Sequence, residues 1–457
     1  MYSTALNEKM NQLQPQIIAA VQEAVRIPSV RENAQPGAPY GAGPKAALDH
    51  ALQLAESLGF KTGCMDGRVG WAEYGSGKEM VGVLGHLDVV PAGEGWTTEP
   101  FGAEIIDGVL YGRGVLDDKG PIIGALFALK AIRDLQIPLR RRIRVLFGTD
   151  EESGSSCMQY YNDHGGEQPA LGFTPDADFP LIYCEKGTTN AILGGSVTDK
   201  GDITVLEMRG GTAANIVTPS CTLKAAGKLQ VTEAPGISVR YENGCTTVTA
   251  TGKGAHGSTP ELGENAAVKL LRAVEKNRFG GDFQKMADFI LQKLGTDTCG
   301  RGLGIFDHDS ETGDTTVNLG IVRYDGKKTE LTLDIRHPKT TDPSHVKKQI
   351  QQAAEAYGLP VQKLWQVPIL YVPKTSPLVK TLLSVYTKQT GEHAEPLAIG
   401  GGTYAKCFKN MVAFGPVFPG EKDVIHQPDE HVEIKKLMRA CQIIAEAMAA
   451  LAQLENI

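Results

Sequence analysis

The chain has 457 residues, of which 41% are hydrophobic and 22% are charged. This length exceeds one ordinary hydrophobic core, so we expect about two or three domains' worth of globular material. The net charge of -7 disfavours a nucleic acid as partner, because phosphate binding requires clustered lysine and arginine side chains. The one such cluster, LRRRIR, is predicted to be a solvated turn before a strand.

The beginning of the chain is predicted to form an amphipathic helix, since it lacks the long apolar core of a signal peptide. No apolar run approaches the length of about 18 residues that a membrane span needs. The eight cysteines are scattered without a C-x-x-C pair, which is typical of reduced thiols. We therefore expect a cytoplasmic protein with neither a membrane nor a nucleic acid as partner.

The predicted elements of residues 1–187 alternate between helices and short apolar strands. Helical patterns cover PKAALDHALQLAESLG and GPIIGALFALKAIRDL, whereas MVGVLGH, IRVLFGT and PLIYCEKG are typical of strands. This alternation favours an α/β domain with a largely parallel sheet.

The following residues, 188–374, have a different pattern. Strand-like runs such as ITVLEMRG, CTTVTATGKG and ELTLDIRHP dominate there, with helices predicted at ENAAVKLLRAVEK and SHVKKQIQQAAEAYG. Residues 375–457 return to the first pattern and close with a long helix. The order predicts a catalytic α/β domain of residues 1–187 and 375–457, interrupted at 188–374 by an α+β domain that acts as a lid.

Carboxylates and histidines occur where several predicted strands end. Taken alone, each is commonplace: a single histidine is more often structural than functional, and Asp-Asp before a helix is an ordinary capping signal. In open α/β sheets, however, ligands bind at the carboxyl ends of the strands, so segments placed in this way are expected to converge. The five segments hold His86 with Asp88, Asp117 with Asp118, Glu151 with Glu152, Asp176 with Asp178, and His426 with Asp429 and Glu430.

Convergence would produce a metal site. Imidazoles and carboxylates suit Zn(II) or Mn(II), whereas thiolates would select other metals. The candidate ligands are His86, Asp117, Glu152, Asp176 and His426. Five ligands are few for two ions unless one carboxylate bridges them, and Asp117, on the turn before a helix, is the candidate bridge.

Two acidic residues beside these ligands have predicted roles of their own. Asp88 follows His86 by two positions and is predicted to accept a hydrogen bond from the far imidazole nitrogen, which fixes the tautomer. If Glu152 binds metal, Glu151 can face a metal-bound water, whose pKa falls toward about 7, and can pass its proton to a leaving amine. The pattern predicts metal-assisted hydrolysis with Glu151 as general base.

The motifs resemble those of the co-catalytic zinc peptidases, a family that includes glutamate carboxypeptidase, aminoacylase and succinyl-diaminopimelate desuccinylase. GHLDVVPAGEGWTTEPF, LYGRGVLDDKGP, GTDEESG, TPDADFP, AHGSTPELGENAA, GGGTYAKCF and VIHQPDE are most similar to bacterial carnosinase-like Xaa-His dipeptidases of the PepV type, and extend from residue 85 to 430. The resemblance implies a mixed sheet flanked by helices with an inserted α+β lid domain. It also implies the same five ligands, with Asp117 favoured over Asp118 as the bridge, and the same roles for Glu151 and Asp88.

The resemblance gives the predicted lid domain its own functional residues. It implies that His256 stabilises the oxyanion of the reaction and that Arg336 binds the C-terminal carboxylate of the substrate. Asn215 and the backbone around Gly401 and Gly402 would help to hold the peptide.

The predicted function is a metal-dependent dipeptidase that hydrolyses unblocked L-dipeptides, either of the β-Ala-His type or broadly, with two divalent ions, Zn(II) before Mn(II). Asp178 or Asp118 would recognise the free amine of the small peptide substrate. The alternatives are an N-acyl-amino-acid amidohydrolase and a catalytically silent peptide-binding homologue. The length of the insert, which can cover a site within one chain, favours a monomer over a homodimer.

Overall fold

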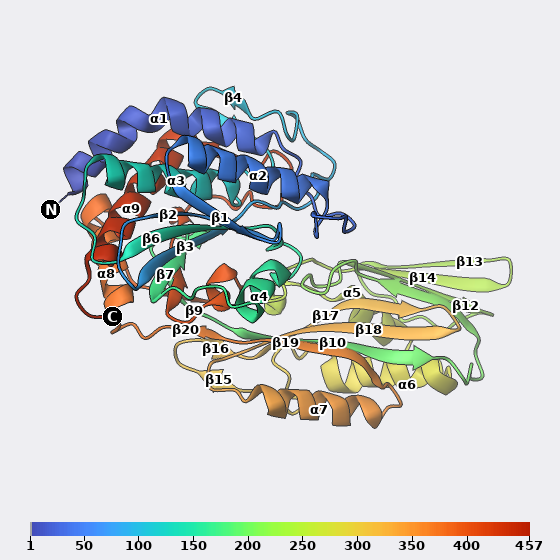
Figure 1. The fold of residues 1–457 in the computed structure, drawn as a ribbon. Helices are drawn as coiled ribbons and strands as arrows, with labels where there is room; N and C mark the ends of the chain where they lie inside the picture. The colour runs from blue at the N-terminus through green and yellow to red at the C-terminus, as the bar shows by residue number, and fades with distance from the viewer. Residues whose placement is uncertain (1) are drawn as a thin grey trace. The chain divides into compact units, whose positions relative to one another are not determined.

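The computed structural model describes residues 2–457 and divides the chain into two compact units (Figure 1). Unit 1 contains the chain up to Cys184, together with Leu370–Leu397 and Gly402–Ile457. Unit 2 contains Glu185–Ile369 and Ala398–Gly401. These bounds differ from the expected division at three places: residues 185–187 and 398–401 belong to unit 2, and residues 370–374 belong to unit 1.

Unit 1 is built on a mixed sheet with the strand order β1-β2-β6-β3-β7-β22-β9-β20. The strands of this path are β1 (Lys61–Met65), β2 (Val69–Tyr74), β3 (Met80–His86), β6 (Arg142–Gly148), β7 (Leu171–Thr174), β9 (Ile182–Glu185), β20 (Leu370–Tyr371) and β22 (Met411–Ala413). The central strands β6, β3, β7 and β22 pair in parallel, whereas β1–β2, β2–β6 and β22–β9 are antiparallel. The expectation of a largely parallel sheet is therefore met only at the centre.

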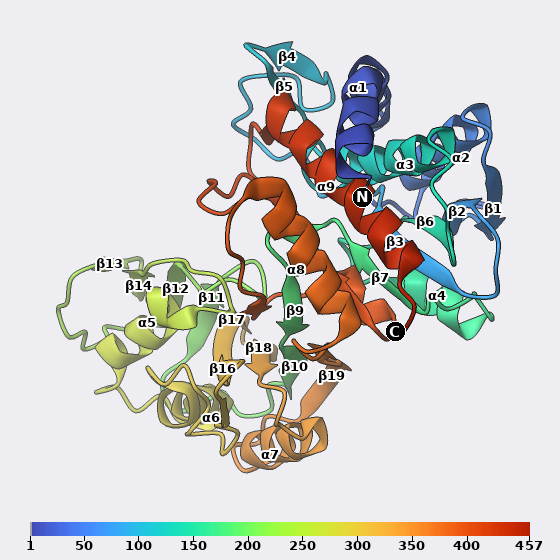
Figure 2. The same ribbon diagram turned by 90° about the vertical axis from the view of Figure 1, so that its left-hand side faces the viewer.

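Helices cover both sides of this sheet. They are α1 (Ser3–Val25), α2 (Ala42–Ser57), α3 (Lys119–Asp134), α4 (Ser156–Asp163), α8 (Pro377–Thr390) and α9 (Ile434–Gln453). Figure 1 shows α1, α2 and α3 on one side and α4 on the other, and in Figure 2 α8 and α9 run side by side, in agreement with their contacts. Within residues 2–457, none of the helices combines the length and the apolar character that crossing a membrane would require.

Strand β3 shows how the sequence positions the functional edge of the sheet. Its residues MVGVLGH are all buried, with neighbouring strands on both edges. Near its end, a Cβ on Gly85 would lie 2.1 Å from Oδ2 of Asp118, so only glycine lets that carboxylate approach the strand. His86 lies beside Gly148 in the parallel register with β6. The residues that follow β3 and β6 therefore emerge at the same edge.

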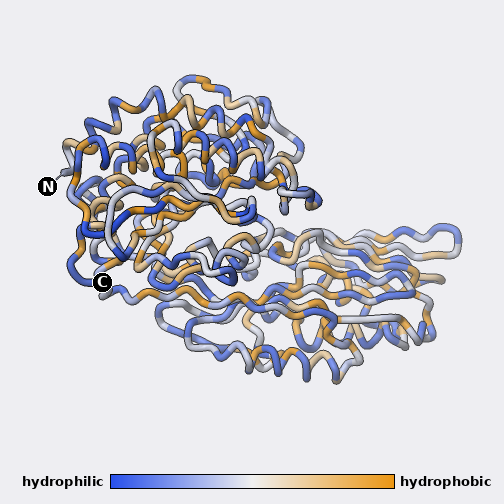
Figure 3. Tube along the Cα trace, viewed as in Figure 1, coloured by the Kyte–Doolittle hydropathy of each residue, from blue (hydrophilic) through white to orange (hydrophobic). Residues whose placement is uncertain are grey.

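Unit 2 has its own sheet, in the order β13-β14-β12-β11-β17-β18-β10-β19, with antiparallel neighbours throughout. Its strands are β10 (Gly187–Ser196), β11 (Val205–Gly210), β12 (Ser220–Ala226), β13 (Ile237–Glu242), β14 (Cys245–Thr251), β17 (Thr316–Tyr324), β18 (Lys328–His337) and β19 (Val361–Val367). In Figure 3, hydrophobic and hydrophilic residues follow one another along these strands, and the burial of β12 and β14 alternates in the same way. This pattern is typical of a sheet with one face on a core.

Three helices pack with the sheet of unit 2: α5 (Ala266–Val274), α6 (Gly281–Phe289) and α7 (Pro343–Glu355). Asn265 caps α5 by accepting the N–H groups of Ala267 and Val268, and Asp342 caps α7 before its first-turn proline. The expected helices correspond to α5 and α7, whereas α6, which begins at Gly281 directly after Gly280, was not expected.

Short pairings in unit 1 hold the later part of the chain against the earlier part. Strand β24 (His431–Glu433) pairs with β5 (Val109–Tyr111), which pairs in turn with β4 (Glu104–Ile106). Strand β23 (Pro416–Val417) pairs with β8 (Ala177–Asp178). The segments around His426 and Asp176 are thereby attached to neighbours that are distant in sequence.

Candidate metal centre

All five predicted metal ligands belong to unit 1 and lie on segments that follow the ends of strands or precede helix α3. His86 ends β3, Glu152 follows β6, Asp176 follows β7, Asp117 lies two residues before α3, and His426 lies on the loop before β24. His86, Asp117 and Glu152 offer ligand atoms that all lie within 4.8 Å of one another. The structure thus brings together residues that span most of the sequence.

The Asp117 carboxylate lies between the two imidazoles. Its Oδ1 is 2.8 Å from Nε2 of His86, and its Oδ2 is 2.9 Å from Nε2 of His426. Nε2 of His86 is also 3.6 Å from Oδ2 of Asp176, while Nε2 of His426 is 3.1 Å from Oε1 of Glu152. One imidazole and one carboxylate therefore lie on each side of Asp117, an arrangement suited to two cations that share its carboxylate.

The electrostatics of the cluster also suit cations. Burial raises the pKa of Asp176 to about 7, and the negative charge of Asp117 adds to the increase. Hydrogen bonds to Asp117 and Glu152 raise the pKa of His426 to about 10. Burial acts to lower the pKa of His86, but the charge of Asp176 and the hydrogen bond between His86 and Asp117 outweigh the effect of burial and hold the pKa well above the usual value. The cluster thus holds more carboxylates than imidazoles at close range, and divalent ions can balance this negative charge.

Glu151 lies beside the candidate ligands, and their charges act on its carboxylate. Burial raises its pKa well above the usual value; His86 opposes this increase, and the charges of Asp176 and Glu152 add to it. A carboxylate in such surroundings holds a proton more strongly than one in water. Burial and neighbouring carboxylates are the usual means by which the pKa of a general acid–base residue is raised.

Asp88 contacts both His86 and the Glu151–Glu152 turn, in a way that differs from the expected contact. Nδ1 of His86 is 2.9 Å from the backbone oxygen of Asp88 but 3.6 Å from its carboxylate Oδ1. The carboxylate oxygens instead accept the backbone N–H groups of Glu151 at 3.0 Å and Glu152 at 3.2 Å. The backbone of Asp88 thus orients the imidazole, and its side chain shapes the turn that carries both glutamates.

The two candidates for recognition of a free amine differ in accessibility. Asp118 has no exposed surface, and its Oδ2 accepts the backbone N–H of His86 at 3.1 Å. Asp178 is exposed on the short strand β8, two residues after Asp176. Only Asp178 is accessible to a ligand in this structure.

Three buried residues around the centre were not assigned roles from the sequence. Lys119 donates from Nζ to the backbone oxygens of Ala24 at 3.0 Å and Ile27 at 2.7 Å, and burial lowers its pKa to about 7. Tyr404 packs edge-on against His86, with the ring centroids 6.1 Å apart. Glu430, noted in the sequence only as a neighbour of His426, has no exposed surface. Lys119 and Glu430 belong to the motifs DDKG and HQPDE, but the sequence does not indicate which groups they contact.

The residues predicted to bind substrate lie mainly in unit 2. His256 is exposed, and its Nδ1 lies 2.6 Å from Oγ of Ser258. Asn215 lies beside His256. The backbone oxygen of Asn215 accepts the N–H of Gly257 at 2.7 Å, and Ile216 forms a β-bridge with His256. The structure therefore brings Asn215 and His256 together.

Arg336 lies near the end of β18 and is largely buried. Its guanidinium contacts Oδ2 of Asp334 at 3.0 Å and the backbone oxygen of Gly400 at 2.5 Å. The His256 loop adjoins this group, because a Cβ on Gly257 would lie 2.5 Å from the same Asp334 oxygen. Gly401 belongs to unit 2 with Gly400, whereas Gly402 belongs to unit 1.

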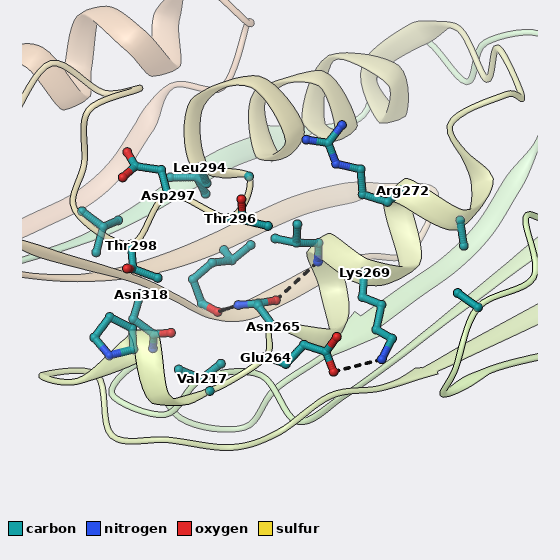
Figure 4. Close-up of a pocket in the computed structure, with 18 of the residues that line it drawn as sticks. Val217, Glu264, Asn265, Lys269, Arg272, Leu294, Thr296, Asp297, Thr298 and Asn318 are labelled. Atoms are coloured by element: carbon teal, nitrogen blue, oxygen red, sulfur yellow. Dashed lines mark hydrogen bonds and ion pairs between the residues drawn. The ribbon is translucent and has the colours of Figure 1, made fainter.

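A separate pocket of unit 2, with a volume of about 510 Å³, lies between α5 and the turn at residues 294–298 (Figure 4). Its wall is largely apolar, and on its rim Lys269 pairs with Glu264 at 2.9 Å. None of the predicted substrate-binding residues lines it. The pocket is therefore distinct from the predicted substrate-binding residues.

Comparisons with known proteins match nearly the whole chain. The model of Peptidase family M20/M25/M40 matches residues 82–450. A Bacillus subtilis (strain 168) protein named "Putative dipeptidase YtjP" is 37% identical over 457 residues, which is 96% of this chain and 97% of that protein. The crystal structure of human carnosine dipeptidase 1 has a TM-score of 0.62 and 15% identity over 99% of both chains. The di-peptidase Dug1p of Saccharomyces cerevisiae has a TM-score of 0.61, also at 15% identity over 99% of both chains. At these identities the solved structures establish a shared fold, and the predicted α/β fold class is confirmed.

Proposed function

The chain belongs to peptidase family M20/M25/M40, and we propose that it is a metal-dependent dipeptidase that hydrolyses unblocked L-dipeptides. The observation that carries the proposal is the Asp117 carboxylate, which lies 2.8 Å from one imidazole and 2.9 Å from the other, with Glu151 beside the cluster. The name of the Bacillus relative supports the choice of dipeptides within the peptidase class.

We assign two divalent ions to the centre, Zn(II) or Mn(II). His86 and Asp176 would hold one ion, His426 and Glu152 would hold the other, and Asp117 would bridge them. Imidazole and carboxylate ligands of this kind suit both metals. When bound, the ions would lower the pKa of a water toward about 7 and polarise the peptide carbonyl.

The proton transfers are assigned to Glu151. Its carboxylate would take a proton from the attacking water and deliver it to the nitrogen of the leaving amine. The hydrogen bond from its backbone N–H to Asp88 holds the turn that carries it. Glu152, the next residue, contacts His426 and is assigned to metal binding. This division gives adjacent glutamates different tasks.

The substrate contacts are assigned to unit 2, which we propose to act as the lid of a catalytic domain formed by unit 1. His256 would stabilise the oxyanion, and Arg336 would bind the substrate's C-terminal carboxylate, with Asn215, Gly401 and Gly402 holding the peptide. Each terminal nitrogen of Arg336 donates one hydrogen bond to Asp334 or Gly400 and keeps a second N–H for that carboxylate.

Asp178 is assigned to recognition of the free amine, because it is exposed whereas Asp118 is buried. We further propose that the protein acts as a cytoplasmic monomer. The scattered cysteines and the large lid support this part of the proposal.

The test is hydrolysis of β-Ala-His or Leu-Gly, beside the N-acetylated form of each, by protein reconstituted with Zn(II) or Mn(II). The proposal predicts cleavage of the free dipeptides alone. Preference for the acetylated forms would identify an amidohydrolase that removes acyl groups. Binding of metal without turnover of either form would indicate a silent peptide-binding homologue.

A further inference from the structure

Glu430 is a wholly buried carboxylate with an unusual set of hydrogen bonds. Its Oε1 accepts the backbone N–H groups of Gly114 at 3.0 Å, Leu116 at 3.0 Å and Asp117 at 3.2 Å. A buried charge is costly unless it is well paired, and three N–H groups that converge on one oxygen form such a pairing. The carboxylate is therefore the centre around which this loop folds.

The other contacts of Glu430 reach the same loop. Oε2 lies 2.6 Å from Nη1 of Arg113, and the backbone oxygen of Glu430 accepts the N–H of Gly112 at 2.9 Å. Arg113 also donates to the backbone oxygen of Ala92 at 3.3 Å, and its guanidinium lies over the ring of Trp96. Glu430 thus accepts hydrogen bonds from the backbone N–H groups of four of the six residues 112–117. It contacts a fifth, Arg113, through an ion pair with its guanidinium.

We propose that Glu430 is a positioning residue that sets Asp117 between His86 and His426. The proposal rests on the metal centre of the proposed function. Glu430 lies four residues after His426, so it joins the loop that carries one imidazole to the backbone of the carboxylate between the two. The spacing of the centre then depends on a side chain that contacts no metal.

The discriminating variant is Glu430→Gln, which keeps the shape of the side chain but removes its charge. Loss of partners that orient a metal ligand typically costs about 10–100-fold in metal affinity, and we expect a loss of this size. In the metal-free variant, the amides of Gly114, Leu116 and Asp117 should exchange with solvent faster than in the metal-free wild type. We expect kcat to fall with little change in KM, because the substrate contacts are elsewhere.

Glu433→Gln is the matched control. Glu433 lies three residues further along the same segment, and its carboxylate pairs with Lys435 and Lys436. This substitution also removes one negative charge close to the centre in sequence. It should leave both the metal affinity and the exchange of the three amides unchanged.

The experiment starts with the metal dissociation constants of the wild type, measured with Zn(II) and Mn(II). A wild type that binds neither ion would refute the proposed function itself. If the wild type binds metal, unchanged metal affinity in Glu430→Gln would overturn the positioning role, even if the variant melts at a lower temperature. Should Glu430→Gln fail to fold, Arg113→Lys replaces it, since the charge is retained and only the paired geometry is lost. Weaker metal binding by folded Arg113→Lys would support the role, and unchanged binding would overturn it.

Discussion

The candidate metal cluster of unit 1 and the predicted substrate-binding residues of unit 2 differ in how their backbones are held. In unit 1, the carboxylates of Asp88 and Glu430 accept backbone N–H groups of the segments that carry the candidate ligands, although His426 itself is exposed on a loop. In unit 2, His256 and Asn215 are exposed on loops, whereas Arg336 is largely buried near the end of β18. The difference teaches that buried carboxylates hold the segments of the candidate metal cluster, whereas most of the residues predicted to bind substrate lie on accessible segments.

The largest expected effect is a loss of kcat from a substitution in the candidate metal cluster of unit 1. Replacement of Glu151 by Gln removes the proposed proton carrier and should lower kcat by about 10²–10⁴-fold, the usual contribution of general acid–base catalysis. Metal content should stay at the wild-type level, as measured by elemental analysis of the dialysed protein. Glu152→Gln is the matched variant and should lose metal instead. Loss of metal from Glu151→Gln would show that the roles of the two glutamates are exchanged.

The next largest effect is expected among the exposed residues of unit 2. His256→Ala removes the proposed oxyanion donor from unit 2 and should reduce kcat by about 10²–10³-fold with metal content unchanged. Ser258→Ala, which removes only the hydroxyl beside Nδ1 of His256, should have a much smaller effect. Equal losses in the two variants would point to the loop conformation as the important factor.

A smaller effect is expected at Arg336. Hydrogen bonds to charged groups contribute about 1.5–3 kcal/mol, so Arg336→Lys should lower kcat/KM for free dipeptides by about 10–100-fold. Dipeptide amides, which lack the C-terminal carboxylate, should be cleaved poorly by the wild type and little worse by the variant. The same loss for both substrates would contradict a carboxylate contact and indicate a role in holding Asp334 and Gly400.

The smallest effect concerns pH and the metal-free protein. The pKa of His426 is raised to about 10 and that of Asp176 to about 7, so both bind protons more strongly when folded. Their contribution to stability is complete below the unfolded values and is lost as pH rises through 7 and then 10. In the metal-free protein this loss is opposed by Lys119, whose pKa is lowered to about 7 by burial and which contributes more stability as pH rises. The clearer quantity is the rise in melting temperature caused by Zn(II), which should be larger at pH 9 than at pH 6 because the ions bind unprotonated ligands. A rise that is the same at both pH values would contradict the account.

The proximity of His86, Asp117 and Glu152 could be predicted from the sequence because carboxyl ends of neighbouring parallel strands meet at one edge of a sheet. His86 and Gly148 are register partners, and the glutamates come directly after that strand. The family resemblance supplied the substrate residues, which the motifs alone do not assign. The motifs alone predicted metal-assisted hydrolysis, and the resemblance narrowed the predicted reaction to that of a dipeptidase.

Other features depend on contacts that no local pattern records. The side chain of Asp88 binds backbone groups 63 and 64 residues away, although the H-x-D spacing favoured a contact with the histidine. The carboxylate of Glu430 reaches the N–H of Asp117 across 313 residues. Helix α6 begins at Gly281 directly after Gly280, and glycine disfavours a helix, so the local sequence did not predict it. In each case the structure depends on contacts with residues that are distant in the sequence.

The most direct test of the central claim, that Asp117 joins two ions in unit 1, is electron paramagnetic resonance of the protein loaded with Mn(II). The account predicts two ions per chain with the spectrum of a spin-coupled pair, and loss of the coupling in Asp117→Asn. One ion per chain, or two ions with uncoupled spectra, would contradict it.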